Sequence, residues 1–531
     1  MGPREGDPEP ALPASDPRND VADGSDATKS GRRETRRQLR GSSVLLVGRV
    51  LSVVLNLVTQ VAIVRYLSTS DYGAFAYALA TVALVGGLLG LGFDRAISRF
   101  LPIYDEQADH ARFLGTAGLV VGIILGLGGA VILLVVGLQA TLLGHLIDDP
   151  LAILIVVIMI FLAPIEALDG VLTDFFAVFS SARTIFVRRY ILAPSLRLTV
   201  VILLILTGRD VVFLAAGYVI AGGVGILLYL TLVPGILRQA GVMDDLRARR
   251  IDIPFREIVS YTFPLLTMDI VLLSISSFDA LLVGNVHGTT EVAELRVVDS
   301  TARLNSIVFQ TFSILFIPTA ARFFARNDRA AMGDMYWRTA AWMAVLSFPV
   351  FALTFSLAQP ITILLFGERY ASSAVILALV STARYIDAAF GANGATIRIF
   401  GGIKEIVVVN LATAVFHVTL ALILVPPFGA VGAAVSILVT YIFYNALKQI
   451  VLRRVSGVPV FDMRYVSTYI AIVVTAVAMA LIVVVFDPPL IVSLAVAGLG
   501  SLAVLAFGRS SLRIGETFPE LLRFPGGRFL G

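Results

Sequence analysis

Long apolar segments constrain this chain more than any other feature of its sequence. One of them, LVVGIILGLGGAVILLVVGL, begins at Leu119 and holds no charged residue. About 20 such residues in an α-helix cross the roughly 30 Å hydrocarbon layer of a membrane. Because lipid offers no partners to backbone N–H and C=O groups, such segments fold as membrane-spanning helices. Composition agrees, since 57% of the residues are hydrophobic, 15% are charged and the mean hydropathy is +0.89.

The apolar segments and the polar turns between them predict an all-α polytopic membrane protein with about fourteen spans. We expect these spans near residues 43–66, 73–97, 113–138, 150–172, 183–207, 211–233, 257–285, 292–319, 337–357, 371–396, 403–425, 429–452, 465–486 and 489–507. The predicted parts are a disordered cytoplasmic tail (1–41), two pseudo-symmetric six-helix lobes (42–233 and 257–454), a cytoplasmic linker (234–256), spans 13 and 14 (455–508), and a cytoplasmic tail (509–531).

The placement of arginine predicts the orientation in the membrane. Loops on the N-terminal side are rich in Arg, for example Arg112, Arg189 and Arg454, whereas the opposite loops hold few, such as Arg65 and Arg209. By the positive-inside rule, we expect both termini on the cytoplasmic side of the cell membrane. The loops on the outer side of the membrane are also short.

The N-terminal segment combines a polar tail with a basic run. Residues 1–30 are rich in Pro, Asp, Gly and Ser, a composition typical of disorder. The run GRRETRRQLRG then precedes the first span and predicts an anchor that contacts anionic lipid headgroups. Its cations are Arg32, Arg33, Arg36, Arg37 and Arg40. Nucleic-acid binding is the less favoured alternative, and we expect no nucleic-acid partner.

No cofactor or metal is expected. The chain has no cysteine, and its histidines are far apart in sequence, so we expect them in loops or packing rather than in a metal site. They are His110, His145, His287 and His417. No GxxxxGK[ST] phosphate loop is present either. Coupling to a H⁺ or Na⁺ gradient or to the membrane potential stays open.

The two halves of the chain echo each other at a shift of about 220 positions. STSDYGAFAYA, beginning at Ser68, aligns with GTTEVAELRVV, beginning at Gly288, and SRFLP at Ser98 parallels ARFFA at Ala321. Repeated bundles with a site at their interface are typical of secondary transporters.

Charged and polar side chains recur along single faces of six predicted spans. The predicted cavity residues are Arg49, Asn56, Gln60, Arg95, Arg99, Arg296, Asp299, Arg303, Arg384, Asp387 and Arg398, and the candidates for ion coupling are Asp269, Asp279 and Glu166. A centrally placed Arg costs about 2.5–3.5 kcal/mol to insert into a membrane, so it is expected to face water or a partner. The abundance of Arg predicts an anionic substrate such as a phosphate or a uronate.

Two alternatives to a shared aqueous cavity remain for some of these residues. Those near a membrane boundary can extend to the interface, namely Arg95, Arg99, Arg296 and Arg398. Asp299 and Arg303, four residues apart, can form a structural ion pair.

Three blocks of sequence resemble the Wzx-like polysaccharide biosynthesis flippases of the MOP (MATE-like) exporter superfamily. The first is a turn at Asp71-Tyr72-Gly73 followed by Gly-Leu-Gly before Arg95 and by RFLP at Arg99. The second, LLFGERYASSAVILALVSTARYIDAAF, contains Phe366-Gly367-Glu368, and the third has a GxxGAA-like turn over 428–434. After Glu291 the chain has Ala293, Leu295 and Arg296 where such proteins usually have a Gly-x-Tyr pattern.

The resemblance implies two six-helix lobes around a cationic cleft that work by alternating access. It further implies a flippase rather than an enzyme, with a polyprenyl-diphosphate-linked oligosaccharide as cargo. Glycosyltransferases or a polymerase of the same pathway are possible partners. On this chain, the implied contacts to sugar acid or diphosphate are Arg49, Arg95, Arg303 and Arg384, and Asp279 matches an acidic position of the seventh span. A multidrug or cation antiporter, a membrane glycan polymerase or ligase, and a lipid II flippase are the alternatives.

Overall fold

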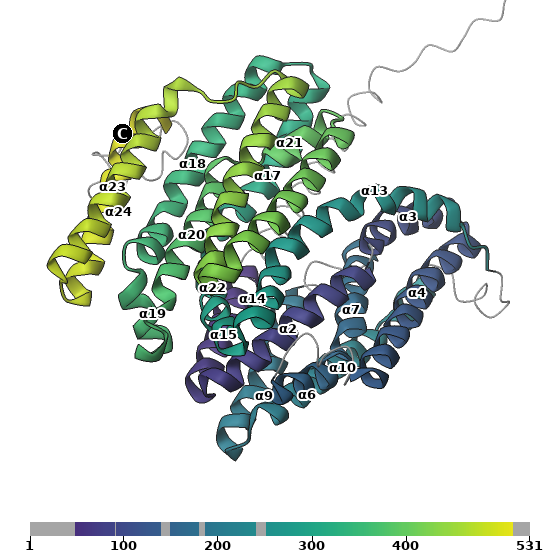
Figure 1. Cartoon of the computed structure of the whole chain (residues 1–531). Helices are drawn as coiled ribbons and strands as arrows, with labels where there is room; N and C mark the ends of the chain where they lie inside the picture. The colour runs from purple at the N-terminus through teal and green to yellow at the C-terminus, as the bar shows by residue number, and fades with distance from the viewer. Residues whose placement is uncertain (1–47, 91, 140–148, 180–185, 240–250, 513–531) are drawn as a thin grey trace, which may run out of the picture.

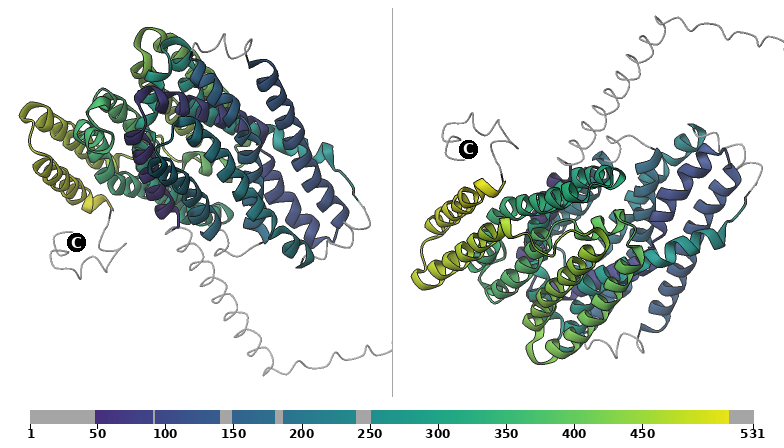
Figure 2. Two further views of the ribbon diagram at one scale, coloured as in Figure 1. Left: turned by 90° about the horizontal axis from the view of Figure 1, so that it is seen from below. Right: turned by 90° about the horizontal axis from the view of Figure 1, so that it is seen from above.

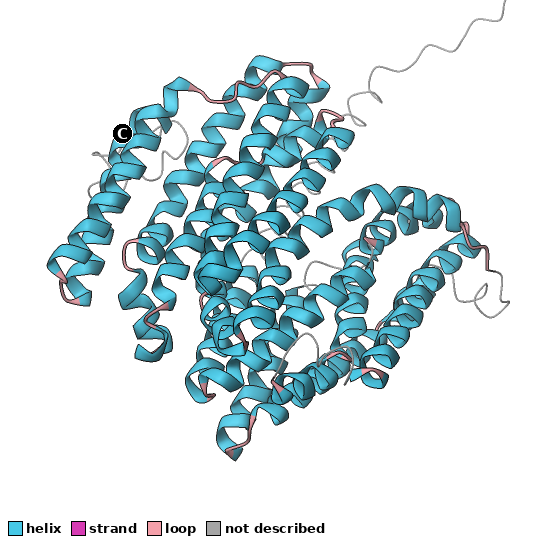
Figure 3. Ribbon diagram, in the orientation of Figure 1, coloured by secondary structure: helices cyan, strands magenta, loops and turns pink. Residues whose placement is uncertain are grey.

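The computed structural model describes residues 48–90, 92–139, 149–179, 186–239 and 251–512, and the regular structure in these ranges is helical (Figure 1, Figure 3). Eleven of the described helices are long and apolar enough to cross a membrane, or up to twelve if the bent pair Thr289–Ser313 and Phe316–Ala325 is one span. The prediction of an all-α, multi-pass membrane protein is confirmed. The number fourteen stays a prediction.

The first half of the chain forms helices close to the predicted positions. They are Gly48–Tyr66, α2 (Thr69–Gly90), α3 (Phe93–Glu106), α4 (His110–Gly137), α6 (Pro150–Met159), α7 (Leu162–Phe179), η1 (Phe186–Leu192), α9 (Ala193–Thr207), α10 (Val211–Leu230) and α11 (Val233–Gln239). Three begin after an aspartate, Asp109, Asp149 or Asp210, whose carboxylate accepts hydrogen bonds from backbone N–H groups of the first turn. Such caps satisfy donors that have no partner inside the helix.

The second half is more broken than its apolar pattern predicts. Its elements are α13 (Phe255–Leu273), η2 (Ser274–Phe278), α14 (Asp279–His287), α15 (Thr289–Val297), α16 (Asp299–Arg303), η3 (Leu304–Ser306), α17 (Ile307–Ala325), α18 (Arg329–Phe355), α19 (Ala358–Phe366), η4 (Glu368–Tyr370), α20 (Ser373–Ala389), α21 (Asn393–Ile399), α22 (Ile403–Ser456), η5 (Met463–Tyr465), α23 (Val466–Phe486) and α24 (Leu490–Leu512). The expected helix over 292–319 is thus interrupted near Val298 and again at Leu304.

The element α22 contains two of the predicted spans. Its 54 residues include a non-helical residue, Gly429, with φ 54° and ψ −133°, directly after Pro426, Pro427 and Phe428. A straight helix of this length would measure about 80 Å, far more than a bilayer. The two helices therefore meet at Gly429, where the predicted GxxGAA-like turn lies.

The helices gather in two groups that meet in the middle of the molecule. Helices up to α10 lie together, α17 to α22 form the other group, and α2, α14, α15 and α22 pack where the groups meet (Figure 1). The pair α23 and α24 packs against α18 at one edge, as two further views also show (Figure 2). The division into two six-helix lobes, with its exact boundaries, stays a prediction.

The two segments whose sequences echo each other lie against each other. A Cβ atom built on Gly73 would lie 2.0 Å from the carbonyl oxygen of Thr289. Only glycine lets the backbones of α2 and α15 approach so closely. This contact places the start of α15 against α2. The charged stripe, which consists of Arg296, Asp299 and Arg303, follows in the chain.

Several predictions concern residues outside the described ranges. They are the tail 1–41 with its basic run, the central part of the linker (240–250), His145, and most of the C-terminal tail (513–531).

Candidate functional site

A cavity of about 480 Å³ lies where the helix Gly48–Tyr66, α2 and the α15–α16 segment meet. Six of the predicted site residues contribute to its wall, namely Asn56, Gln60, Glu166, Arg296, Asp299 and Arg303. Further polar groups there are Thr59, Tyr72, Arg197, Tyr218, Ser277 and Ser300. Charged side chains from several helices therefore line one cavity. Their roles in binding stay predictions.

Three arginines and two acids set the charge of the cavity wall. Arg197 Nη2 lies 3.1 Å from Glu166 Oε1, and Arg296 Nη1 lies 2.7 Å from Asp299 Oδ2. Arg303 Nη2 is 3.9 Å from the same Asp299 oxygen, and 59% of its side chain is exposed. Arg303 is therefore the least engaged of the three cations, and the wall carries one positive charge in excess.

Gln60 connects the first helix to the break in the charged stripe. Its amide nitrogen donates to the carbonyl oxygens of Arg296 (3.0 Å) and Val297 (2.9 Å) and lies 3.2 Å from the Tyr72 hydroxyl. Ser300 donates to its amide oxygen. An interrupted helix within a membrane has backbone groups that need new partners, and Gln60 supplies two of them. It thereby holds Arg296 and Asp299 at the cavity wall.

The first helix presents opposite chemistry on its two faces. Asn56 and Gln60 lie four residues apart and reach the cavity, as helical periodicity predicts. Val54 and Val58 are 49% and 50% exposed on another face, where lipid is the solvent. Polar residues therefore occur inside this apolar segment because one face of the helix borders the cavity.

Five predicted arginines lie outside the residues that form the cavity wall: Arg49, Arg95, Arg99, Arg384 and Arg398. Arg95 makes a two-pronged ion pair with Asp269 of α13, at 2.7 and 3.1 Å. The Arg99 guanidinium lies 4.3 Å from the centre of the Tyr261 ring. These contacts join α3 to α13, which also packs against α22.

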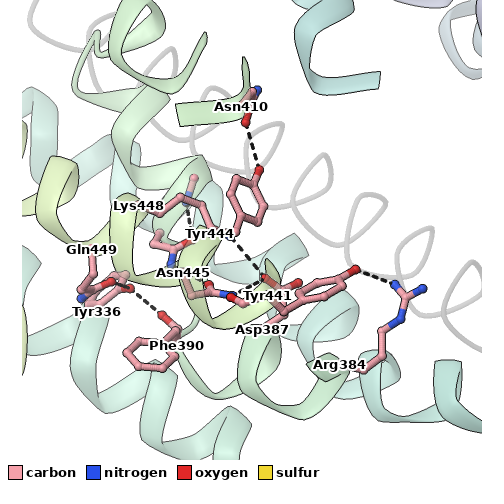
Figure 4. A network of polar contacts seen from close by, with 12 residues as sticks. Tyr336, Arg384, Asp387, Phe390, Asn410, Tyr441, Tyr444, Asn445, Lys448 and Gln449 are labelled. Carbon is pink, nitrogen blue, oxygen red and sulfur yellow. Dashed lines mark hydrogen bonds and ion pairs between the residues drawn. The ribbon is translucent and has the colours of Figure 1, made fainter. Parts of the chain in front are cut away.

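A polar network follows α20 and the second part of α22 (Figure 4). Arg384 Nη1 donates to the Tyr441 hydroxyl at 3.0 Å. Asp387 accepts hydrogen bonds of 3.2 Å from Asn445 and from Lys448. Lys448 is 6% exposed, and its ammonium also lies 3.8 Å from the centre of the Tyr444 ring. Asp387 therefore has a cationic partner within its own group of helices.

Arg384 links this network to the charged stripe. Together with Asp279, Arg296, Asp299 and Arg303 it borders a second, small void of about 20 Å³. Asp279 also faces His417, which the sequence predicted in a loop or in packing. The distance from Asp279 Oδ1 to His417 Nε2 is 3.4 Å.

Three residues of these clusters were absent from the predicted set: Arg197, Lys448 and His417. Arg197 stands alone in the apolar segment APSLRLTVVILLILT, so the rule that identified the other embedded charges also identifies it. The sequence does not predict that Arg197 lines the cavity, because this depends on how α9 packs against α7 and α10. Among the described residues, no group of three or more His, Cys, Asp or Glu side chains is placed to hold a metal ion.

Solved structures with the same fold are flippases and transporters. The lipid II flippase MurJ in an inward closed conformation has a TM-score of 0.67 and 13% identity, over 88% of this chain and 99% of that chain. An inward-facing multidrug resistance MATE family transporter of the MOP superfamily has a TM-score of 0.61 and 16% identity, over 77% of this chain and 95% of that chain. The MATE multidrug transporter DinF-BH in complex with R6G has a TM-score of 0.53 and 13% identity, over 80% of this chain and 97% of that chain. At such identities the likeness establishes the fold alone.

The sequence itself has a family match. No curated protein matches it, but the profile of the family described as "Polysaccharide biosynthesis protein" matches residues 38–324. The match extends over more than half of the chain and includes the first helix, α2 and the charged stripe of α15–α16. The predicted family is confirmed: this chain belongs to the polysaccharide biosynthesis protein family.

Proposed function

We propose that this protein translocates a polyprenyl-(di)phosphate-linked oligosaccharide from the cytoplasmic to the outer leaflet by alternating access through the cavity of about 480 Å³. The observation that carries the proposal is the excess of arginine in the cavity wall. Arg303 extends into this space with 59% of its side chain exposed. A guanidinium offers a planar pair of donors that matches phosphate and carboxylate groups.

A hydrated cavity removes the main barrier to flipping. A glycan headgroup that enters hydrocarbon loses hydrogen bonds to water, at several kcal/mol for each polar group left unsatisfied. Amide, hydroxyl and guanidinium groups replace that water in the cavity, while the lipid tail stays in the bilayer. The step breaks no covalent bond, so it requires no catalytic group.

The wall chemistry separates this function from its alternatives. A multidrug or cation antiporter of the same fold needs acidic groups available to a cation, but Glu166 and Asp299 each pair with an arginine. A glycan polymerase or ligase needs catalytic groups, whereas the family and the solved structures of this fold favour a flippase. The proposal leaves the sugar unspecified, and lipid II is one member of the substrate class.

The test is translocation of a fluorescent polyprenyl-diphosphate-linked oligosaccharide in proteoliposomes, read by dithionite bleaching of the outer leaflet. A charge-assisted hydrogen bond contributes about 1.5–3 kcal/mol, so we expect Arg303→Ala to slow translocation by about 10- to 150-fold. The control is Arg326→Ala, a change of an exposed arginine outside the cavity wall, at the end of α17. Equal rates for Arg303→Ala and the native protein would reject the anion-binding role of the cavity.

A further inference from the structure

Asp279 and His417 form a deeply buried acid–base pair. Asp279 is 2% exposed and His417 is fully buried. In the described part of the chain, neither carboxylate oxygen of Asp279 nor Nε2 of His417 has a hydrogen-bond partner. His417 Nδ1 lies 3.0 Å from the Thr440 hydroxyl, which orients the imidazole. The three side chains come from α14 and from the two parts of α22.

Burial restricts the charge that this pair can carry. A carboxylate without hydrogen bonds in a low-dielectric interior is costly unless a cation faces it or a proton neutralises it. One proton shared by the pair satisfies this condition, either as imidazolium with carboxylate or as imidazole with carboxylic acid. Removal of that proton leaves one net negative charge at Asp279.

The surroundings of Asp279 contain the same cations that face the substrate cavity. Arg296, Asp299 and Arg303 from α15 and α16 and Arg384 from α20 border the small void together with Asp279. Tyr441 of α22 accepts a hydrogen bond from Arg384, and Tyr77 of α2 lies against Gly284 of α14. Arg296 and Arg303 also line the larger cavity. Asp279 is therefore a second internal anion positioned toward arginines that already pair with Asp299.

We infer that Asp279 and His417 form a proton-binding site that is coupled to anion binding in the cavity. The inference rests on the proposed function and adds a proton site that regulates anion binding. When the pair loses its proton, the Asp279 carboxylate competes with the substrate anion for the guanidinium groups of Arg296, Arg303 and Arg384. When the pair takes up a proton, the competition ends and these groups are available to the anion.

The coupling is reciprocal by thermodynamic necessity. A proton that strengthens anion binding is itself bound more strongly when the anion is present. With one proton per anion, the affinity for the anion rises by at most about tenfold for each unit by which pH falls. A proton suits this site better than Na⁺, because hard cations prefer oxygen ligands and an imidazole nitrogen faces the carboxylate here.

The experiment measures proton uptake during anion binding by the full-length protein in detergent. The probe is inorganic sulfate, whose charge is constant between about pH 5.5 and pH 8. Calorimetric titrations in two buffers of different ionisation enthalpy report the protons taken up for each sulfate bound. We expect uptake to approach one proton in the native protein and the dissociation constant to fall as pH falls.

Variants separate this site from other titrating groups. Asp279→Asn is isosteric and permanently neutral, so we expect it to bind sulfate at all pH values with the affinity that the native protein has at low pH, without proton uptake. His417→Gln should also abolish the uptake. The control is His287→Gln, which changes a histidine at the end of α14 outside both cavities and should preserve the uptake.

The outcomes distinguish the inference from the function on which it rests. Sulfate binding that requires Arg303, but keeps its pH dependence in Asp279→Asn, overturns the proton site and preserves the anion-binding cavity. The same conclusion follows if replacement of choline by Na⁺, rather than pH, changes the affinity. Absence of sulfate binding at every pH, or equal binding by Arg303→Ala, overturns both. If His417→Gln does not fold, the isosteric Asp279→Asn decides the question.

Discussion

Two arginines hold the groups of helices together at the end of the bundle that we predict to face outward. Arg65, at the end of the first helix, donates to the carbonyl oxygens of Leu364 (2.5 Å) and Leu365 (2.8 Å) near the end of α19. In return, Arg369 donates to the carbonyl oxygen of Val64. Each cation therefore caps the C-terminal end of a helix from the other group, where backbone carbonyls have no partner and the helix dipole favours positive charge.

Removal of both arginines should open this end of the molecule. Three hydrogen bonds and two cation–dipole contacts are lost. Because the donors are partly exposed, we take about 0.5–1 kcal/mol for each hydrogen bond and a few tenths for each dipole contact. The total of about 2–3 kcal/mol corresponds to a shift of about 30- to 150-fold in the ratio of closed to open molecules.

The assay is a distance measurement between two spin labels across this end. The chain has no cysteine, so labelled cysteines can be introduced at Leu206 and Val375 without other changes. These side chains are 77% and 56% exposed and belong to α9 and α20. In the double variant Arg65→Gln/Arg369→Gln, we expect a new population at longer distance in double electron–electron resonance.

The matched control is Arg326→Gln, which removes an exposed arginine at the end of α17 and should preserve the native distribution. Unchanged distances in the double variant would refute the argument that these two arginines hold the end closed.

Two further predictions concern packing and buried charge. Gly73→Ala should strongly reduce the yield of folded protein, because the added Cβ would lie 2.0 Å from a carbonyl oxygen of α15, whereas Gly118→Ala, in open space, should have little effect in the same chromatographic assay. Lys448→Met should lower stability by about 2 kcal/mol or more, since Asp387 loses its cation. The double variant Asp387→Asn/Lys448→Met should recover most of the thermal midpoint, and failure to recover would contradict the unpaired carboxylate as the cause of the loss.

Much of the fold is predictable because its determinants are local. The ends of the apolar segments and the aspartates before α4, α6 and α10 locate helices within a few residues, since both act over one or two turns. The expected helix over 292–319 was wrong in its continuity. The backbone carbonyl groups at the break accept hydrogen bonds from Gln60, a residue more than 230 positions away in sequence. A hydropathy pattern does not identify so distant a partner.

The sequence by itself determined that the chain crosses a membrane many times and that Arg296, Asp299 and Arg303 lie on one stripe, because apolar length and helical spacing are properties of neighbouring residues. Only the tertiary structure decided which charges share a space. It joined Arg197 to the cavity, paired Arg95 with Asp269, and placed His417 against Asp279, 138 positions away in sequence. The physical reason is that a charge in a membrane is stabilised by whichever partner packing brings within a few ångströms, and packing depends on the whole chain.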